Sequence, residues 1–228
     1  MSSISAILHR YRQLQQQHDA WFSRALQQFP EAICCARGCA QCCRGLFDIS
    51  LLDAWVLRQG FEGLPASTQR QIEARALARL GELQQRWPEL KPPYLLNTLA
   101  DDGWMEMPED DPTPCPLLSA EGLCLVYHHR PLTCRLHGLP NVDRSGEIFA
   151  DHYCTLNFPG IDPLTLSGLR GGFRDAFAAE MALLGALTTE LLGRPLSELD
   201  TFIPLAVLVD YAEVDWAEVG RSLNRAAG

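Results

Sequence analysis

The sequence predicts a mainly α-helical protein with small β-hairpins, built as one domain over residues 1–228 around a cysteine-ligated metal site. Three observations lead to this prediction. Apolar residues recur at helical spacing in two flanking regions, residues 1–30 and 160–228. Short apolar runs separated by glycine-containing turns occur between them. Nine cysteines fall within residues 34–154, a density that neither helix nor strand formation requires.

The N-terminal flank predicts one long amphipathic helix over residues 3–29. Ser2 or Ser3 can cap its start, and Pro30 ends it. His18 lies on the apolar face of this helix. A histidine in that position is more often packed in the core than used as a ligand, so we expect His18 to be buried.

Two further helices are expected after the first cysteines. Ser50 and Asp53 have the spacing of a capping box, which predicts a helix that starts there and ends at Gly60. The next helix is predicted to open at Ser67 or Thr68 and to stop before residue 88, a proline.

The middle of the chain predicts short strands. Residues 116–127 read as a hairpin with its turn at 119–122, and a second turn at 143–146 precedes the run 147–150. The connection over residues 92–116 is proline-rich and acidic. It lacks the spacing of a calcium loop, so its carboxylates are interpreted as a solvated loop: Asp101, Asp102, Glu106, Glu109, Asp110 and Asp111.

The C-terminal flank is expected to be helical again. One apolar face should end at Gly193, and an apolar stretch over residues 202–209 should lead to a short helix over 214–226. The residues of that face are Leu169, Phe173, Phe177, Met181, Leu184, Leu187 and Leu191.

Charge and hydropathy narrow the function classes. The net charge is −9 and Lys91 is the only lysine, which argues against nucleic-acid binding and against an anionic membrane surface. We find neither a signal-peptide pattern at the N-terminus nor a run of about 18 apolar residues, so a cytoplasmic location is expected. In a reducing cytosol, clustered cysteines favour metal binding or redox chemistry over disulfides.

The cysteine spacing predicts the ligands. Cys39 and Cys42 form a C-x2-C pair, whose two-residue gap lets both thiolates face one ion. Cys43 is adjacent to Cys42, and neighbouring side chains diverge, which suits several irons better than one zinc. Cys34 is an alternative to Cys35 or a reactive spare. The eight predicted metal ligands are Cys35, Cys39, Cys42, Cys43, Cys115, Cys124, Cys134 and Cys154.

Eight thiols fit two four-thiolate sites, one large cluster, or one cluster with a separate redox pair. Their negative charge needs hydrogen-bond donors and cations nearby, and three arginines close to cysteines are predicted to bind the cofactor in this way: Arg44, Arg130 and Arg135. Four histidines could complete a mixed site, although hydrogen bonding is their favoured role: His128, His129, His137 and His152. If one is a ligand, His137 or His152 is preferred. A single catalytic cysteine nucleophile is disfavoured by the surplus of thiols, and no catalytic residue is assigned.

The motifs together resemble a known family. The runs GCAQCCRG at residues 38–45, CPLL at 115–118 and GLCLVYHHRPLTCR at 122–135 resemble the CxxCxxCC (YkgJ-type) cysteine-cluster family of zinc- or iron-chelating domains over residues 34–155. The resemblance implies metal binding through Cys39, Cys42, Cys43, Cys115, Cys124 and Cys134. Cys35 matches the family's first cysteine with one extra residue before Cys39, and Cys154 lies just beyond the recognisable run. The family includes enzymes that N-methylate flagellin lysines.

Three functions follow as hypotheses. The first is an iron–sulfur protein, with a four-iron cluster favoured, that acts in redox chemistry or electron transfer with an unidentified protein partner. The second is a zinc-binding structural or interaction module. The third, implied only by the resemblance, is a protein-lysine N-methyltransferase-like enzyme. Whether the protein is an enzyme stays open at this point.

Overall fold

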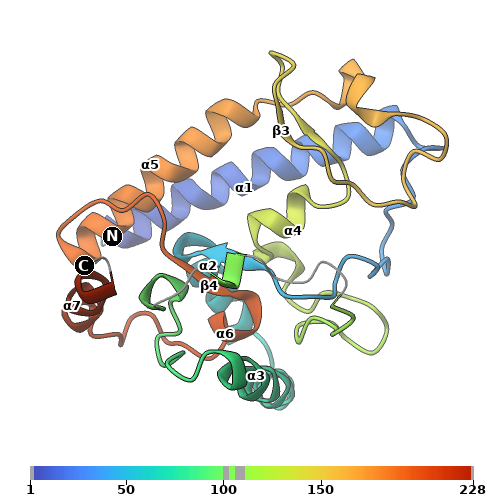
Figure 1. Ribbon diagram of the computed structural model, residues 1–228. Coiled ribbons are helices and arrows are strands. Elements are labelled where there is room, and N and C mark those ends of the chain that lie inside the picture. Colours follow the sequence, from blue (N-terminus) through green and yellow to red (C-terminus); the bar gives the residue numbers. More distant parts are fainter. Residues whose placement is uncertain (1–2, 100–102, 106–110, 227–228) are drawn as a thin grey trace.

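The computed structural model describes residues 3–99, 103–105 and 111–226 (Figure 1). The predicted mainly α-helical fold with small β-hairpins is confirmed. The helices are α1 (Ser3–Gln28), α2 (Leu51–Glu62), α3 (Ala66–Arg86), α4 (Leu132–Leu136), α5 (Phe173–Leu192), α6 (Ile203–Ala206) and α7 (Trp216–Ala226). The strands are β1 (Asp48–Ser50), β2 (Asn141–Val142), β3 (Ile148–Ala150) and β4 (Asp200–Phe202).

The two flanking regions pack on each other through their long helices. Figure 1 shows α1 and α5 side by side and running in opposite directions. The helix predicted over residues 3–29 is confirmed as α1, and α5 ends at Gly193, whose φ of 72° is the left-handed conformation typical of a helix C-terminus. The cysteine region therefore lies in the part of the chain that connects the end of α1 to the start of α5, its antiparallel neighbour.

α2 runs past its predicted end. Gly60 lies inside the helix, which continues to Glu62 with Gly63 as its cap. A Cβ atom on Gly60 would lie 2.5 Å from the Cβ atom of His129, so this glycine allows a close approach rather than ending the helix. α3 begins at Ala66, slightly before the predicted start.

The predicted capping box at the start of α2 forms only in part. The Ser50 hydroxyl accepts a hydrogen bond from the Asp53 amide at 3.4 Å, as predicted. The Asp53 carboxylate does not complete the box. It accepts hydrogen bonds from the Gln15 side chain at 2.9 Å and from the Leu132 amide at 2.8 and 3.0 Å, and so connects α1, α2 and α4.

Short strands fix the loops. β1 and β4 pair antiparallel with Asp48 opposite Phe202, a contact that sequence reasoning missed. β2 and β3 pair around the predicted turn, where the Asp143 carboxylate accepts from the Ser145 amide at 2.9 Å. The hairpin expected over residues 116–127 forms as a tight turn with a single bridge between Leu118 and Cys124.

Two hydrophobic clusters hold these elements together. The larger one combines the N-terminal part of α1 with α2, α3, α6 and the C-terminal part of α5. The smaller one combines the C-terminal part of α1 with α4 and the beginning of α5. Cys115 and Cys124 pack against the larger cluster and Cys35 packs against the smaller one, so the cysteine region contacts both.

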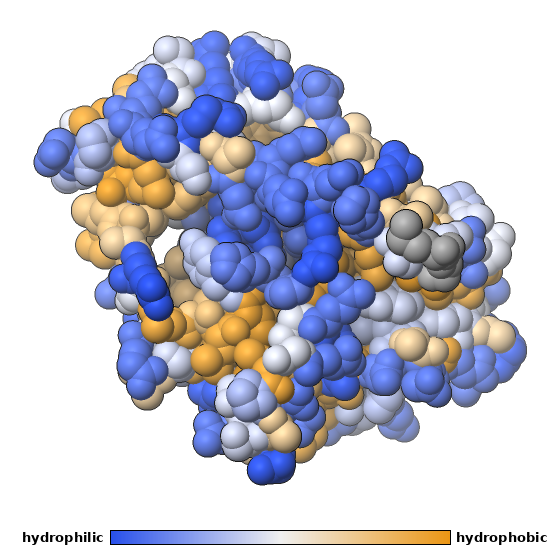
Figure 2. Space-filling model, turned by 180° about the vertical axis from the view of Figure 1, so that it is seen from behind, coloured by the Kyte–Doolittle hydropathy of each residue, from blue (hydrophilic) through white to orange (hydrophobic). Residues whose placement is uncertain are grey.

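The surface is mostly polar with separate apolar areas. Seen from behind, hydrophilic residues cover much of the molecule, and apolar residues reach the surface in several places (Figure 2). Within the described ranges, no helix combines the length and apolar character needed to cross a membrane.

Candidate metal centre

The early cysteine segment, residues 34–45, consists of two successive turns. The Cys39 amide donates to the Ala36 carbonyl and the Cys43 amide donates to the Ala40 carbonyl, both at 3.0 Å. Gly38 lies inside the first of these turns with a φ of 87°, a left-handed conformation that glycine adopts without strain. Each turn ends on a cysteine, so the local sequence brings several thiols into a short loop.

The late cysteine segment, residues 113–157, places its thiols on different kinds of structure. Cys115 and Cys124 lie on either side of the tight turn at residues 119–122, and Cys134 lies on the short helix α4. Cys154 follows β3, and its amide donates to the Gly138 carbonyl at 3.2 Å. The residues between these cysteines thus fold back onto the same region.

Backbone hydrogen bonds join the two segments. The Cys115 amide donates to the Cys43 carbonyl at 2.9 Å, and the Gly45 amide donates to the Thr113 carbonyl at 2.9 Å. At a second point, a Cβ atom on Gly122 would lie 3.1 Å from the Gly38 carbonyl oxygen. The segments are about seventy residues apart in sequence and lie in direct contact in the structure.

Asn157 is a further connection, and sequence reasoning missed it. Its buried side chain accepts a hydrogen bond from the Cys34 amide at 2.9 Å and donates to the Gly138 carbonyl at 2.7 Å. Its amide nitrogen also lies 3.5 Å from the Cys35 sulfur. The sequence offered one weak signal, an asparagine three residues after Cys154. Only the fold shows that it reaches the early segment.

One group of thiols gathers around Cys35. Burial raises the pKa of the Cys35 thiol, the hydrogen bond from Asn157 lowers it, and the charges of neighbouring thiols raise it further. Those neighbours are Cys39, Cys42 and Cys154. Cys39 is exposed, whereas the other three are partly buried.

A second group gathers around Cys134. The side chain of Cys134 is accessible, yet desolvation raises its pKa well above the ordinary value, with further contributions from Cys115, Cys124, Asp53 and Cys42. Burial also raises the pKa of Cys115, to about 11.

Cys42 belongs to both groups. A hydrogen bond with the neighbouring Cys43 thiol is the main cause that raises the Cys42 pKa, followed by burial. Cys42 also acts electrostatically on Cys35 and on Cys134. Each of the eight cysteines predicted as ligands thus interacts electrostatically or by a hydrogen bond with at least one other of them. In the described part of the chain, no three Cys, His, Asp or Glu side chains yet converge closely enough to hold an ion. A metal held by three or more of these sulfurs would have to draw them together.

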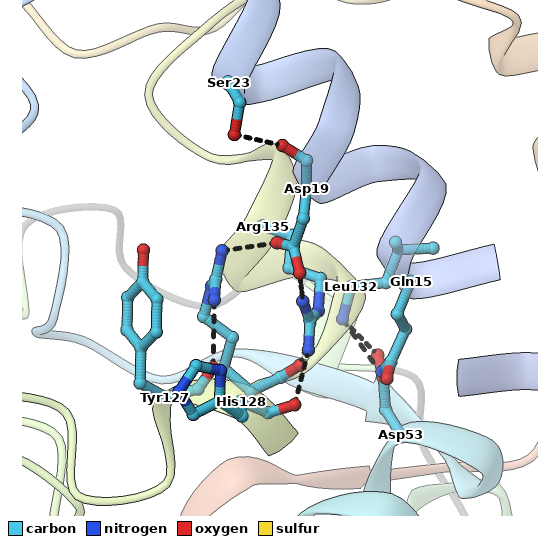
Figure 3. Close-up of polar contacts among 9 residues, drawn as sticks. Gln15, Asp19, Ser23, Asp53, Tyr127, His128, Leu132 and Arg135 are labelled. Carbon is cyan, nitrogen blue, oxygen red and sulfur yellow. Dashed lines mark hydrogen bonds and ion pairs between the residues drawn. The ribbon is translucent and has the colours of Figure 1, made fainter. Parts of the chain in front are cut away.

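Two of the three predicted arginines connect the late segment to α1. The carboxylate of Asp19 pairs with Arg130 at 2.7 Å and with the buried side chain of Arg135 (Figure 3). Arg135 also donates to the carbonyls of His128 and Arg130, both at 3.0 Å. Arg44 is exposed and contacts Gln41 at 3.5 Å.

These arginines influence one thiol directly. Burial raises the pKa of Cys124, while the positive charges of Arg130 and Arg135 lower it. Both guanidinium groups therefore stabilise a thiolate at this position, although their shortest contacts are with Asp19.

His18 is buried and His129 is half-buried, whereas His128, His137 and His152 are exposed. His18 is buried as predicted and stacks on Phe173 with the ring centroids 6.0 Å apart. His129 packs over Gly60, and His137 contacts the Phe47 ring edge-on at 5.6 Å. His152 is exposed, 3.6 Å from Asp151, and His128 is exposed as well.

The acidic connection contributes one described carboxylate. Asp111 forms an ion pair with Arg79 and accepts a hydrogen bond from the Thr113 amide at 2.9 Å. The other carboxylates predicted for this loop lie outside the described residues: Asp101, Asp102, Glu106, Glu109 and Asp110.

A fold that joins two cysteine segments into one set of thiols defines a cysteine-rich metal-chelating domain. A family model described as "CxxCxxCC: Putative zinc- or iron-chelating domain" matches residues 34–155, which is more than half of the chain. The chain belongs to this family. No curated protein and no solved structure matches the chain.

Proposed function

We propose that this protein carries an iron–sulfur cluster of the four-iron type and acts in electron transfer or redox chemistry. The observation that carries the proposal is the position of Cys42. Its thiol contacts Cys43 and lies within electrostatic reach of Cys35 on one side and of Cys134 on the other. A set of eight sulfurs connected through adjacent cysteines suits several irons better than one tetrahedral zinc ion.

The proposed ligands are the eight cysteines predicted from the sequence. The contacts of Cys34 and Cys35 support Cys35 as the first of them. The Cys34 thiol donates to the Leu156 carbonyl at 3.1 Å, whereas the Cys35 thiol lies among three other thiols and near the Asn157 amide group. Amide donors to sulfur stabilise a cluster and adjust its potential. Cys34 is then a spare thiol.

The arginines have a supporting role in this proposal. Arg130 and Arg135 offset negative charge near Cys124, and Arg44, next to Cys43, can turn toward the sulfurs from its exposed position. The exposed Cys39 places one edge of the thiol set at the surface. A cluster held there is within reach of a protein partner that exchanges electrons with it.

The test is metal analysis of protein purified without oxygen. We expect brown protein that contains iron and acid-labile sulfide, with a paramagnetic-resonance signal after reduction. Colourless protein with stoichiometric zinc and no iron, both after expression in iron-supplemented cells and after reconstitution with iron and sulfide, would refute the proposal.

A zinc-binding structural module is the second candidate, and one observation favours it. Cys35 packs on the smaller hydrophobic cluster, while Cys115 and Cys124 pack on the larger one, so a metal would connect the two. This candidate predicts that a chelator unfolds residues 34–157 and that voltammetry shows no redox wave. A reversible reduction potential would exclude it.

A further inference from the structure

A pocket of about 650 Å³ lies next to α4, where α2, α5, β1, β2 and β3 meet. α4 contributes Leu132, Thr133 and Leu136 to its wall, and His137, which follows the helix, lines it too. Cys134 lies on the same short helix without lining the pocket. The pocket is therefore separate from the thiol set and adjacent to it. Its volume is in the range of sites that bind small molecules.

Three carboxylates line this pocket, the exposed Asp48 and the more deeply placed Asp53 and Glu180, and its lining includes neither arginine nor lysine. Asp53 on α2 is buried and accepts hydrogen bonds from Gln15 and from the Leu132 amide. Glu180 on α5 accepts from the Tyr11 hydroxyl at 3.1 Å and from the Ser50 hydroxyl at 3.4 Å. In the part of the chain that the structure describes, neither forms an ion pair with arginine.

The electrostatics of the pocket follow from this arrangement. Desolvation and the charge of Glu180 raise the pKa of Asp53 to about 7, and desolvation raises the pKa of Glu180. Desolvation lowers the pKa of His137, one of the two histidines that line the pocket, with a smaller effect from His152. A buried pair of carboxylates without a counter-charge is costly, and a bound cation would relieve that cost.

Asn141 gives an independent indication of a ligand. This residue of β2 lines the pocket and is only 8% exposed. Its side-chain oxygen is buried and accepts no hydrogen bond from the described residues. Buried acceptors in native proteins nearly always have a donor, so an unpaired one beside a pocket indicates a ligand with N–H or O–H groups.

Aromatic rings supply the rest of the specificity. Phe47, which precedes β1, and Phe177 on α5 both line the pocket. Aromatic faces attract organic cations, and apolar walls favour a ligand with an aliphatic part. A hydrated metal ion would gain nothing from these rings.

From these contacts we infer that the pocket binds a small aliphatic ammonium compound, with its charged N–H groups directed at Asp53, Glu180 and Asn141 and its carbon chain against Phe47 and Phe177. This inference does not depend on which metal the cysteines hold. It gives the protein a small-molecule site separated from the thiol set by α4.

The test is isothermal titration of the full-length, metal-loaded protein with n-butylamine at neutral pH. We expect saturable binding of the amine, no binding of n-butanol, which has the same chain without charge, and weaker binding of butyltrimethylammonium, which has charge without N–H donors. Equal binding of butylamine and butanol, or no saturable binding of butylamine, would overturn the inference.

Matched variants locate the site. Glu180→Gln keeps an acceptor for Tyr11 and Ser50 while removing the charge, and should weaken butylamine binding about tenfold. Glu190→Gln makes the same change at an exposed position of the same helix and should leave binding unchanged. If Glu180→Gln and Glu190→Gln bind butylamine with equal affinity, the amine binds outside this pocket.

Asn141→Ala tests the unpaired oxygen. It should weaken binding of butylamine more than that of butyltrimethylammonium, because only the first donates N–H groups. A parallel thermal unfolding curve shows whether each variant is folded. If Asn141→Ala weakens both ligands equally while remaining folded, the oxygen has no part in recognition. If that variant fails to fold, the Glu180 and Glu190 pair still decides whether the site is in this pocket.

Discussion

The early and late cysteine segments differ in how the rest of the protein supports them. The early segment is a loop of two turns with exposed Cys34 and Cys39, and Cys35 is its one cysteine that packs on a hydrophobic cluster, the smaller one. The late segment has one exposed cysteine, Cys134. In the late segment, Cys115 and Cys124 pack on the larger hydrophobic cluster, and burial raises the pKa of both thiols. We infer that the late segment is the fixed half of the centre and that the early segment closes on the metal.

The largest expected effect is on metal content, because both halves supply ligands. Cys42→Ser in the early segment and Cys115→Ser in the late segment should each prevent incorporation of the proposed cluster. Iron and sulfide per chain and the visible spectrum measure this. Cys34→Ser is the matched control and should retain the metal, because its thiol contacts the Leu156 carbonyl. Full iron content in Cys42→Ser would remove the early segment from the centre.

The next effect is on the free energy of unfolding, which should depend on Arg135 of the late segment much more than on Arg44 of the early segment. Arg135→Met in the late segment should lower the free energy of unfolding by about 2–3 kcal/mol, because Asp19 and two carbonyls lose a buried donor. Arg44→Met in the early segment should change it by less than about 0.5 kcal/mol, because this side chain is exposed. Urea titration of both variants measures the difference. Equal losses would mean that the early segment is as firmly supported as the late one.

Features that depend on local sequence were predicted correctly. The bounds of α1 follow from helical periodicity and from Pro30, and the end of α5 at Gly193 follows from glycine's preference for a positive φ. The order of cysteine motifs was sufficient to identify the family. These signals lie within a few residues of the structure that they predict.

Features that depend on distant residues could not be predicted. β1 and β4 have three residues each, too few for a recognisable strand pattern, and they pair across about 150 positions. Asn157 meets Cys35 across 122 positions. Asp53 was interpreted as part of a helix cap, because sequence spacing cannot show that α1 and α4 offer it better donors. Gly60 was read as a helix end because its contact with His129 is equally remote.

A smaller effect, on the rate of metal loss, is expected where the early and late segments are in contact. Gly38 and Gly122 both have a positive φ, so alanine at either position costs about 1 kcal/mol of strain. Only at Gly122 would the added Cβ atom meet a backbone oxygen, that of Gly38 in the other segment. Gly122→Ala should therefore lose its metal faster than Gly38→Ala when a chelator is added. If the two variants lose metal at the same rate, this contact does not hold the segments together.

The smallest expected effect is a pH dependence of the free energy of unfolding. It arises at Asp53, which contacts the start of α4 in the late segment. Desolvation and the charge of Glu180 raise the pKa of Asp53 from 3.8 to about 7 in the folded state. Between these values the folded protein holds a proton that the unfolded chain releases. The contribution of Asp53 to the free energy of unfolding is therefore fully present below about pH 4. It is lost as the pH rises through about 7.

Asp53→Asn removes this titration while leaving an oxygen that can accept from the Leu132 amide at the start of α4. The variant should reduce the decline in unfolding free energy across that window without abolishing it, since the pKa of Glu180 is also raised and contributes a decline of the same sign. Asp175→Asn, exposed on α5, should retain the slope. Thermal unfolding at constant metal content measures both. An unchanged slope in Asp53→Asn would mean that Asp53 stays ionised in the folded protein, and that the donors from α1 and α4 outweigh its burial.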